Sequence, residues 1–350
     1  MADVVNSLFI KQDGKFYDLY DLPDGFVIKG DLDLSGKGLT ELPDLSKVIV
    51  EGNFLCENNQ LTSLQGAPQK VGRNFRCENN QLTSLQGAPQ EVGGYFLCEN
   101  NQLTSLQGAP QKVGGDFSCE NNQLTSLQGA PQKVGRNFWC ENNQLTSLQG
   151  APQKVGGYFL CNKNQLTSLQ GAPQEVGGNF ECGYNQLTSL QGAPQKVGRD
   201  FLCPDNKLTS LEGAPQEVGG GFDCSDNQLT SLQGAPQKVG GYFSCQDNQL
   251  TSLQGISKEI DGKIEVDINI SAQYGFNDGE IKLDDLKNSP LYREEIFISE
   301  KSKELRRKVM RTIAAENVSP EKGVTNKKRT AGEKNAIKQI LDGIGKSIEK

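Results

Sequence analysis

The feature that most constrains the fold is a phrase of 21 residues, close to NFRCENNQLTSLQGAPQKVGG, which recurs along the chain with few changes. A fixed period of about 20 to 29 residues is typical of stacked coils that bury their apolar side chains against one another. Degenerate units at 28–42 and from Ile260 extend the array at both ends, so we predict twelve strands. The cysteine of each full repeat marks the period, at Cys56, Cys77, Cys98, Cys119, Cys140, Cys161, Cys182, Cys203, Cys224 and Cys245.

The pattern within one repeat indicates how a coil is built. In the stretch Tyr95-Phe96-Leu97-Cys98-Glu99, polarity alternates, so Phe96 and Cys98 point inward while their neighbours point outward. The segment GAPQKVGG is too short and too rich in Gly and Pro to form a helix. We therefore predict a β-rich solenoid, an arc of about twelve coils with a parallel concave sheet, a non-helical convex side and a small α-helical C-terminal region.

Two invariant columns have structural interpretations. An asparagine follows each strand (Asn59, Asn80, Asn101 and their successors), and its amide is suited to bonding backbone groups of its own coil and a neighbour. The alternative is an exposed ladder that binds a ligand. The cysteine spacing matches no zinc motif, so we expect free, buried thiols and a reducing compartment.

Variation among the repeats concentrates at three outward columns of the strand, before Phe, between Phe and Cys, and after Cys. In a solenoid these columns line the concave face, which is the usual binding surface. Unconstrained drift is the alternative, but drift favours small polar residues, and this face carries the only Trp of the chain. The expected contact residues are Tyr95, Leu97, Trp139, Tyr158, Leu160, Arg76, Glu78, Glu99, Glu120, Glu141 and Tyr242.

Charge is distributed unevenly along the chain. The formal net charge is −7, although residues 301–350 alone hold 14 Lys+Arg against 6 Asp+Glu. The five successive glutamates from Glu57 to Glu141 would repel phosphate, which disfavours nucleic acid on the solenoid and favours a protein with a basic or mixed surface. An arginine recurs every third unit, at Arg73, Arg136 and Arg199, and we interpret this as duplication of three-repeat blocks.

The two ends differ from the array, so we expect an N-terminal cap at 1–26, a solenoid at 27–270 and a basic, mostly helical region at 271–350. The cap contains a hairpin around Asp13-Gly14. Apolar spacing predicts one helix through Leu305, Val309 and Ile313 and a second from Thr330. The candidate contacts with an anionic partner are Arg306, Arg307, Lys308, Lys327, Lys328 and Arg329. A solvated helix surface, docking to an acidic protein, nucleic acid or anionic membrane, and self-association all remain open for them.

The phrase NQLTSLQGAP resembles the bacterial leucine-rich-repeat proteins whose units carry NQLTSLP, including the type III effector group, and similar arrays occur in phage proteins. The resemblance covers residues 28–270 and implies the leucine-rich-repeat fold. Here the unit is one residue longer, and Cys stands where the effectors usually have Leu or Val. Some effector relatives carry a C-terminal ubiquitin-ligase domain with a catalytic Cys. This chain has no Cys after Cys245, so that activity is not transferred.

No catalytic constellation emerges from the sequence, which contains no His, no P-loop and no GxSxG motif. We therefore expect no enzyme activity, no cofactor and no metal site. No run of about 18 apolar residues indicates a membrane span, and no secretory signal is recognisable. The predicted location is the reducing cytoplasm, with signal-independent delivery into a host cell left open. The predicted function is a protein-binding scaffold, as a bacterial effector or phage-encoded modulator of a host protein. The alternatives are a structural component anchored through the C-terminal helices and an enzyme with a cryptic C-terminal site.

Overall fold

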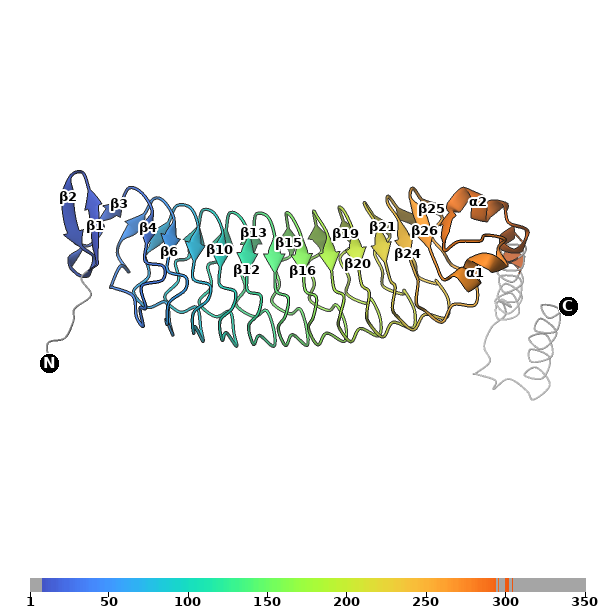
Figure 1. Ribbon diagram of the computed structural model, residues 1–350, viewed down its shortest axis with the longest axis horizontal. Helices are drawn as coiled ribbons and strands as arrows, with labels where there is room; N and C mark the ends of the chain where they lie inside the picture. Colours follow the sequence, from blue (N-terminus) through green and yellow to red (C-terminus); the bar gives the residue numbers. More distant parts are fainter. Residues whose placement is uncertain (1–7, 294, 296–299, 302–303, 305–350) are drawn as a thin grey trace, which may run out of the picture. The chain divides into compact units, whose positions relative to one another are not determined.

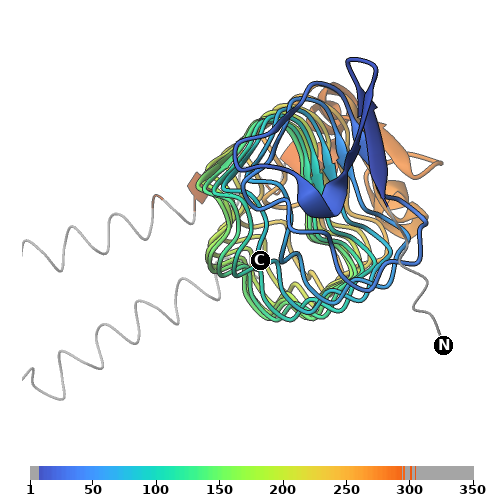
Figure 2. The ribbon, with the colours of Figure 1, turned by 90° about the vertical axis from the view of Figure 1, so that its left-hand side faces the viewer.

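The computed structural model describes residues 8–293, 295, 300–301 and 304. These residues divide into two compact units: the described residues up to Ala272 with Phe276–Leu283, and Gln273–Gly275 with the described residues from Asp284 onward. The first unit is a solenoid whose coils stack side by side along its length (Figure 1). Seen end-on in Figure 2, successive coils follow nearly the same path, as expected when one sequence unit repeats.

Each coil contributes one strand to each of two sheets, whereas the sequence analysis anticipated only the first of them. All twelve solenoid strands within each sheet are parallel to their neighbours, and β27 adds an antiparallel strand to the first sheet. The first sheet contains β4 (Leu32–Asp33), β6 (Phe54–Leu55), β8 (Phe75–Arg76), β10 (Phe96–Leu97), β12 (Phe117–Ser118), β14 (Phe138–Trp139), β16 (Phe159–Leu160), β18 (Phe180–Glu181), β20 (Phe201–Leu202), β22 (Phe222–Asp223), β24 (Phe243–Ser244), β26 (Lys263–Glu265) and β27 (Glu280–Lys282). The second contains β3 (Val27–Ile28), β5 (Ile49–Val50), β7 (Lys70–Val71), β9 (Glu91–Val92), β11 (Lys112–Val113), β13 (Lys133–Val134), β15 (Lys154–Val155), β17 (Glu175–Val176), β19 (Lys196–Val197), β21 (Glu217–Val218), β23 (Lys238–Val239) and β25 (Glu259–Ile260).

The return segments between the strands are irregular. From Val27 to Glu265, a fully described stretch, the structure has no α-helix, which confirms the predicted non-helical convex side. Glycine permits one sharp bend in each coil; Gly150, for example, has a φ of 96°. Its backbone runs so close to the preceding coil that an added Cβ would lie 2.4 Å from the Leu127 carbonyl oxygen. The glycine-rich composition therefore follows from the close stacking of coils.

The solenoid interior is a set of apolar columns. In one coil Val92, Phe96, Cys98, Leu103 and Leu106 are each at most 2% exposed, as the alternation predicted. The phenylalanines of successive first-sheet strands form a continuous stack, with neighbouring ring centroids between 5.0 and 5.7 Å apart. Offset aromatic pairs at such distances contribute about 0.5–1.5 kcal/mol each beyond the burial of their area. This stack holds the first-sheet strands in register.

The ten cysteines are all free and buried, which confirms that part of the prediction. Each thiol that makes a hydrogen bond donates it to a strand carbonyl of the following coil, as Cys98 Sγ does to the Ser118 oxygen at 3.0 Å. Burial is the main cause that raises the pKa of Cys98 well above the ordinary value. A protonated, enclosed thiol is a poor nucleophile, so the column is part of the core.

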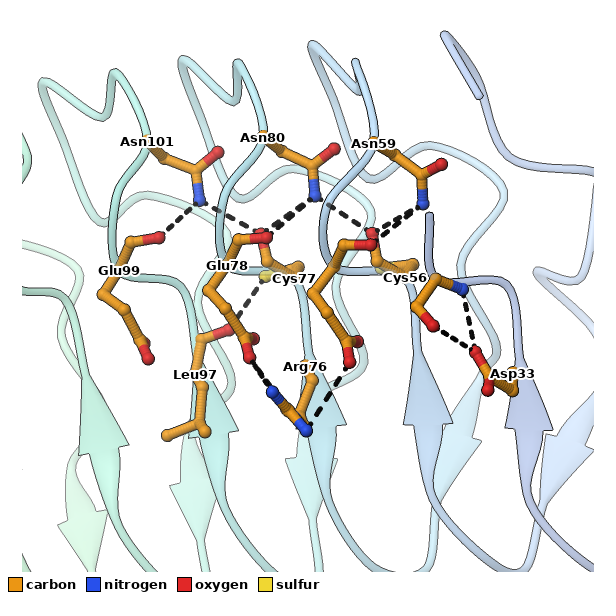
Figure 3. A network of polar contacts seen from close by, with 12 residues as sticks. Asp33, Cys56, Asn59, Arg76, Cys77, Glu78, Asn80, Leu97, Glu99 and Asn101 are labelled. Atoms are coloured by element: carbon orange, nitrogen blue, oxygen red, sulfur yellow. Dashed lines mark hydrogen bonds and ion pairs between the residues drawn. The ribbon is translucent and has the colours of Figure 1, made fainter. Parts of the chain in front are cut away.

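The asparagine column ties successive coils together (Figure 3). The Asn80 amide nitrogen donates to the carbonyl oxygens of Cys56 at 3.0 Å, Cys77 at 3.2 Å and Glu78 at 3.3 Å. Its amide oxygen accepts from the Leu61 backbone nitrogen at 3.0 Å. The same pattern recurs in the following coils, so the structural interpretation of this column is confirmed. These bonds satisfy backbone groups at the point where each chain leaves its strand.

The N-terminal hairpin predicted around Asp13-Gly14 is present, formed by β1 (Phe9–Gln12) and β2 (Lys15–Asp18). Both turn residues have positive φ, 51° and 79°, as a tight two-residue hairpin turn requires. A short 3-10 helix, η1 (Leu19–Asp21), follows. Gln12 joins the hairpin to the first coil, because its amide donates to the Val27 oxygen at 3.0 Å and accepts from the Lys29 nitrogen at 2.9 Å.

After the last coil the described residues include the short helices α1 (Ile268–Gln273) and α2 (Leu283–Asn288), and residues 290–293 are also helical. The helices predicted through Leu305, Val309 and Ile313 and from Thr330 lie outside the described residues. So do the candidate anionic-partner contacts Arg306, Arg307, Lys308, Lys327, Lys328 and Arg329. Among the residues that are described, no helix is both long enough and apolar enough to cross a membrane.

Candidate functional site: the outward face of the first sheet

The outward residues of the first sheet form a grid, which we call the strand face. It consists of the three columns before Phe, between Phe and Cys, and after Cys. The strands pair without any shift, so that Leu97 aligns with Ser118, and Trp139 aligns with both Ser118 and Leu160. Parallel strands lie about 4.8 Å apart, so each column presents one side chain at each such step. Residues that are 21 positions apart in sequence are therefore direct neighbours on this surface.

The middle column holds the apolar part of the face. Leu97, Trp139 and Leu160 are each partly exposed, while Ser118, which separates the first two, is only 1% exposed. The indole nitrogen of Trp139 is buried and has no hydrogen-bond partner among the described residues. A tryptophan with its ring partly exposed and its N–H unpaired is the type of residue that often anchors a protein interface.

Two tyrosines of the first column lie flat across the neighbouring coil. The Tyr95 ring covers Gly115 so closely that an added Cβ would lie 2.3 Å from a ring carbon. Its hydroxyl accepts a hydrogen bond from Arg136 Nη1 at 3.1 Å, and the Arg136 guanidinium carbon lies 5.9 Å from the ring centroid. Tyr158 makes the equivalent bond with Arg199, at 3.3 Å.

These contacts give the three-unit arginine period a structural role. Each tyrosine passes over a glycine in the next coil and reaches the arginine two coils away. The block duplication that the sequence indicated does not by itself predict this contact, because the partners are 41 residues apart. The signal that could have found it is the shared period: Tyr95 and Tyr158 are separated by the same 63 residues as Arg136 and Arg199.

The third column of the strand face begins with five glutamates, which we call the glutamate column. The first two of them are largely buried. Glu57 is 6% exposed and Glu78 is 4% exposed, although both were expected on an open surface. Arg76 lies between them: its Nε donates to Glu78 Oε1 at 2.8 Å, and its Nη1 is 3.5 Å from Glu57 Oε1 (Figure 3). The second oxygen of each glutamate remains buried without a hydrogen-bond partner among the described residues. One arginine thus serves two carboxylates.

The next three glutamates have raised pKa values. Burial is the main cause for Glu99, Glu120 and Glu141 alike. For Glu120 the neighbouring carboxylates Glu141 and Glu99 add to the effect, and the pKa rises to about 7. Like charges one strand spacing apart favour protonation of one of them. Glu120 therefore exchanges its proton near neutral pH.

Replacing Glu120 with Gln should stabilise the protein at pH 8, because it removes a carboxylate whose ionisation is unfavourable in the folded state. We expect a gain on the order of 1 kcal/mol, since solvent at the face screens part of the charge interaction. In the folded state the Glu120 carboxyl keeps its proton up to about pH 7, whereas the unfolded chain releases it near 4.5. The cost of ionising Glu120 therefore grows as pH rises between these values, and it is absent below 4.5. Urea unfolding of Glu120→Gln and wild type at pH 5 and pH 8 measures the difference. A matched Glu212→Gln variant, changed at an exposed turn, should show none. An equal stability difference at both pH values would contradict the shifted titration.

The C-terminal part of the strand face is also acidic. Burial raises the pKa of Tyr242 to about 12, with further contributions from Asp223, Asp200, Glu265 and Glu181. Tyr242 precedes β24, and three strands of the first sheet separate β24 from β16. The structure thus brings the predicted contact residues from Arg76 to Leu160 together on neighbouring strands, but Tyr242 is not part of that group.

The turn after each strand contains residues that the sequence analysis did not single out. The first residue of the Asn-Asn pair has a left-handed backbone, as at Asn58, where φ is 57°. Asn and Asp tolerate this conformation, but Lys163 and Tyr184 adopt it as well, with φ of 54° and 53°. Tyr184 is 56% exposed. In the sequence, these two residues could have been recognised because the other full repeats have Asn or Asp at this position.

Asp205, Asp226 and Asp247 occupy the same turn position in three successive coils. Within the described residues, no group of three or more His, Cys, Asp or Glu side chains is arranged to hold a metal ion. Three carboxylates on successive coils form a row and not a cage, and calcium takes six to eight oxygen ligands around one point.

Three solved leucine-rich-repeat structures are similar to this chain at low sequence identity. No protein-family model matches the sequence, and no curated protein matches it. Among solved structures, YopM from Yersinia enterocolitica WA-314 is 20% identical, with a TM-score of 0.39 over 65% of this chain and 59% of that one. The leucine-rich effector YopM from Yersinia pestis is 22% identical, with a TM-score of 0.44 over 67% and 73% of the two chains. The leucine-rich-repeat domain of APL1B is 15% identical, with a TM-score of 0.45 over 70% and 85%. This chain thus spans about three fifths of the length of the first of these structures.

The architecture is that of a leucine-rich-repeat solenoid with a 21-residue unit. The assignment follows from the parallel strands stacked one per repeat in each sheet, the leucine columns of the core and the asparagine column that joins the coils.

Proposed function

We propose that this protein is a non-enzymatic scaffold that binds another protein through the strand face, centred on Trp139. The supporting observation is the contrast between constant and variable columns. The Phe, Cys, Leu and Asn columns hold the frame, while the outward columns change from coil to coil and share one continuous sheet surface. A rigid frame that presents a varied surface is suited to recognition.

The chemistry of the face indicates the kind of partner. Leu97, Trp139 and Leu160 supply partly exposed apolar area, and carboxylates border this area in the adjoining column. A protein with a basic or mixed surface complements it, whereas the phosphates of nucleic acid would be repelled. The thiols, all buried, offer no nucleophile, which supports a binding role over catalysis.

We further propose that the partner is a host protein and that this chain acts as a bacterial effector or phage-encoded modulator. The support is the resemblance of the NQLTSLQGAP unit to bacterial and phage repeats. A reducing cytoplasm, of the bacterium or of a host cell reached by signal-independent delivery, suits ten unpaired thiols.

The test is affinity capture from host lysate with the full chain, comparing wild type with the triple variant Trp139→Ala, Tyr158→Ala, Leu160→Ala. The matched control replaces Gln123, Gln144 and Gln165, exposed residues of one column outside the strand face, with Ala. Circular dichroism establishes that all three proteins are folded. We expect one protein to be retained by wild type and the control but reduced at least tenfold with the triple variant, and then to bind in purified form. Equal capture by all three proteins, or none by any, would remove the strand face as the binding site.

A further inference from the structure

The glutamate column already contains one example of how it binds a cation. Arg76 extends from β8 and bridges the carboxylates of Glu57 and Glu78 in successive coils. A planar guanidinium has five N–H donors, so it can contact two carboxylates that are one strand spacing apart. The geometry is visible in Figure 3, where the carboxylates of Glu78 and Glu99 extend toward the same side as the Arg76 guanidinium.

Beyond Arg76 the described residues provide no guanidinium to the column, although Glu120 accepts a hydrogen bond from Ser118 Oγ and Glu141 accepts one from Asn162 Nδ2, both at 3.5 Å. None of the ion pairs in the described part of the chain involves Glu99, Glu120 or Glu141. The Oε2 atom of Glu99 is buried and lacks a hydrogen-bond donor, as do those of the more than nine-tenths buried Glu57 and Glu78. Buried acceptors without donors are uncommon in native proteins and each calls for an explanation. A cation supplied by a partner protein would provide charged hydrogen-bond donors for the carboxylates of the column.

The adjoining column favours an arginine as that cation. Trp139 lies between Ser118 and Leu160 in strand register and is two residues before Glu141, on the same side of the strand. A guanidinium can stack on an indole ring while it donates to a carboxylate, and its aliphatic stem can contact leucine. A lysine ammonium is a strongly hydrated point charge that makes the paired contact less well.

We propose that Glu99, Glu120, Glu141 and Trp139 form a docking surface for arginine side chains of an extended segment of the partner protein. The inference rests on the proposed function and names the chemistry that the face recognises. The three glutamates span two strand spacings, roughly 9.6 Å, and alternate side chains of an extended chain are about 6.8 Å apart. Two arginines in an Arg-x-Arg arrangement therefore fit along the column. The glutamates must be ionised to bind arginine, so the affinity for arginine increases as pH rises.

The full chain can be titrated with the peptides acetyl-(Gly-Arg)4-amide and acetyl-(Gly-Lys)4-amide at low salt. The fluorescence of Trp139, the only Trp, reports binding at the site. We expect the arginine peptide to bind several-fold more tightly than the lysine peptide at pH 8. Its affinity should fall at least tenfold at pH 5.5, where the glutamates of the column hold more protons.

Two variants that each remove three carboxylates distinguish binding at this site from general electrostatic attraction to an acidic protein. The triple variant Glu99→Gln, Glu120→Gln, Glu141→Gln should weaken the arginine peptide at least tenfold and lose the pH dependence. The control Glu91→Gln, Glu212→Gln, Glu217→Gln removes three exposed carboxylates outside the strand face and should stay within twofold of wild type. Equal weakening by both variants, or by neither, would overturn the proposal, as would equal affinity for the two peptides.

The outcome is separable from that of the scaffold proposal. If Trp139→Ala, Tyr158→Ala, Leu160→Ala loses a captured protein but the triple glutamine variant retains it, the scaffold stands and the arginine site is wrong. If wild type captures no protein while the peptide test gives the expected pattern, the scaffold proposal fails and the arginine site stands.

Discussion

Replacing Asn122 with Ala should lower the free energy of unfolding by about 4 kcal/mol, because it removes four hydrogen bonds and leaves the buried Leu103 backbone nitrogen without a partner. The Asn122 amide nitrogen donates to the carbonyl oxygens of Cys98 at 3.1 Å, Cys119 at 3.2 Å and Glu120 at 3.0 Å. The Leu103 nitrogen donates to its amide oxygen at 2.9 Å. These groups belong to two coils, so the substitution weakens the interface between neighbouring repeats as well as one turn.

The adjacent residue provides the control for this prediction. Gln123 is exposed, and Gln123→Ala should change the unfolding free energy by less than about 0.5 kcal/mol. Urea unfolding followed by circular dichroism measures both variants. A stack of repeats is stabilised by nearest-neighbour interfaces, so the Asn122 variant should also unfold less cooperatively. Similar midpoints for the two variants would show that the asparagine column does not hold the coils together.

A single methyl group added at Gly135 should destabilise the protein by at least about 3 kcal/mol. The Cβ of Gly135→Ala would lie 2.1 Å from the Gly114 carbonyl oxygen and 2.9 Å from its carbonyl carbon. Both are backbone atoms of the preceding coil and cannot rotate away as a side chain would. Gly135 donates its N–H to the Val113 oxygen at 3.0 Å, so any separation of the coils also lengthens hydrogen bonds. Thermal and urea unfolding measure the loss.

Gly30 is the matched site at the open start of the array. An added Cβ there meets nothing within 4 Å, and Gly30 is not among the residues with positive φ. Gly30→Ala should therefore be neutral or stabilise by up to about 1 kcal/mol, because alanine restricts the unfolded chain more than glycine does. The same chemical change is thus expected to have opposite signs at the two positions. Destabilisation of equal size at both would mean that close approach of the coils is not the cause.

The architecture and the core could be predicted from the sequence because each depends on a pattern within one repeat. The alternation around Phe96 and Cys98 determines which side chains face inward, since neighbouring residues of a strand point to opposite sides. The Gly and Pro content of GAPQKVGG excludes a helix in the return segment. The repeat period places every such unit next to an identical one, so the inward columns of buried Phe, Cys and Leu followed directly.

Part of the candidate site could not be predicted, because it depends on contacts between coils. The local pattern places Arg76 two residues before Glu78, but it does not give the burial of Glu78 or the effect of Glu99 and Glu141, in the adjacent coils, on the pKa of Glu120. The bond between Arg136 and Tyr95 joins residues 41 positions apart. The second sheet also emerged only in the structure, because the pairing of its strands depends on neighbouring coils and its segments lie beside the Gly- and Pro-rich return.

The sequence by itself thus determined the repeating coil, its buried columns and the columns that face outward. The tertiary structure alone decided which outward carboxylates are enclosed, which tyrosine reaches which arginine and which glycines have no space for a methyl group. The physical reason is the range of the interactions. Inward or outward direction is determined by adjacent residues of one strand, whereas the burial and charge of an outward side chain depend on residues one and two coils away.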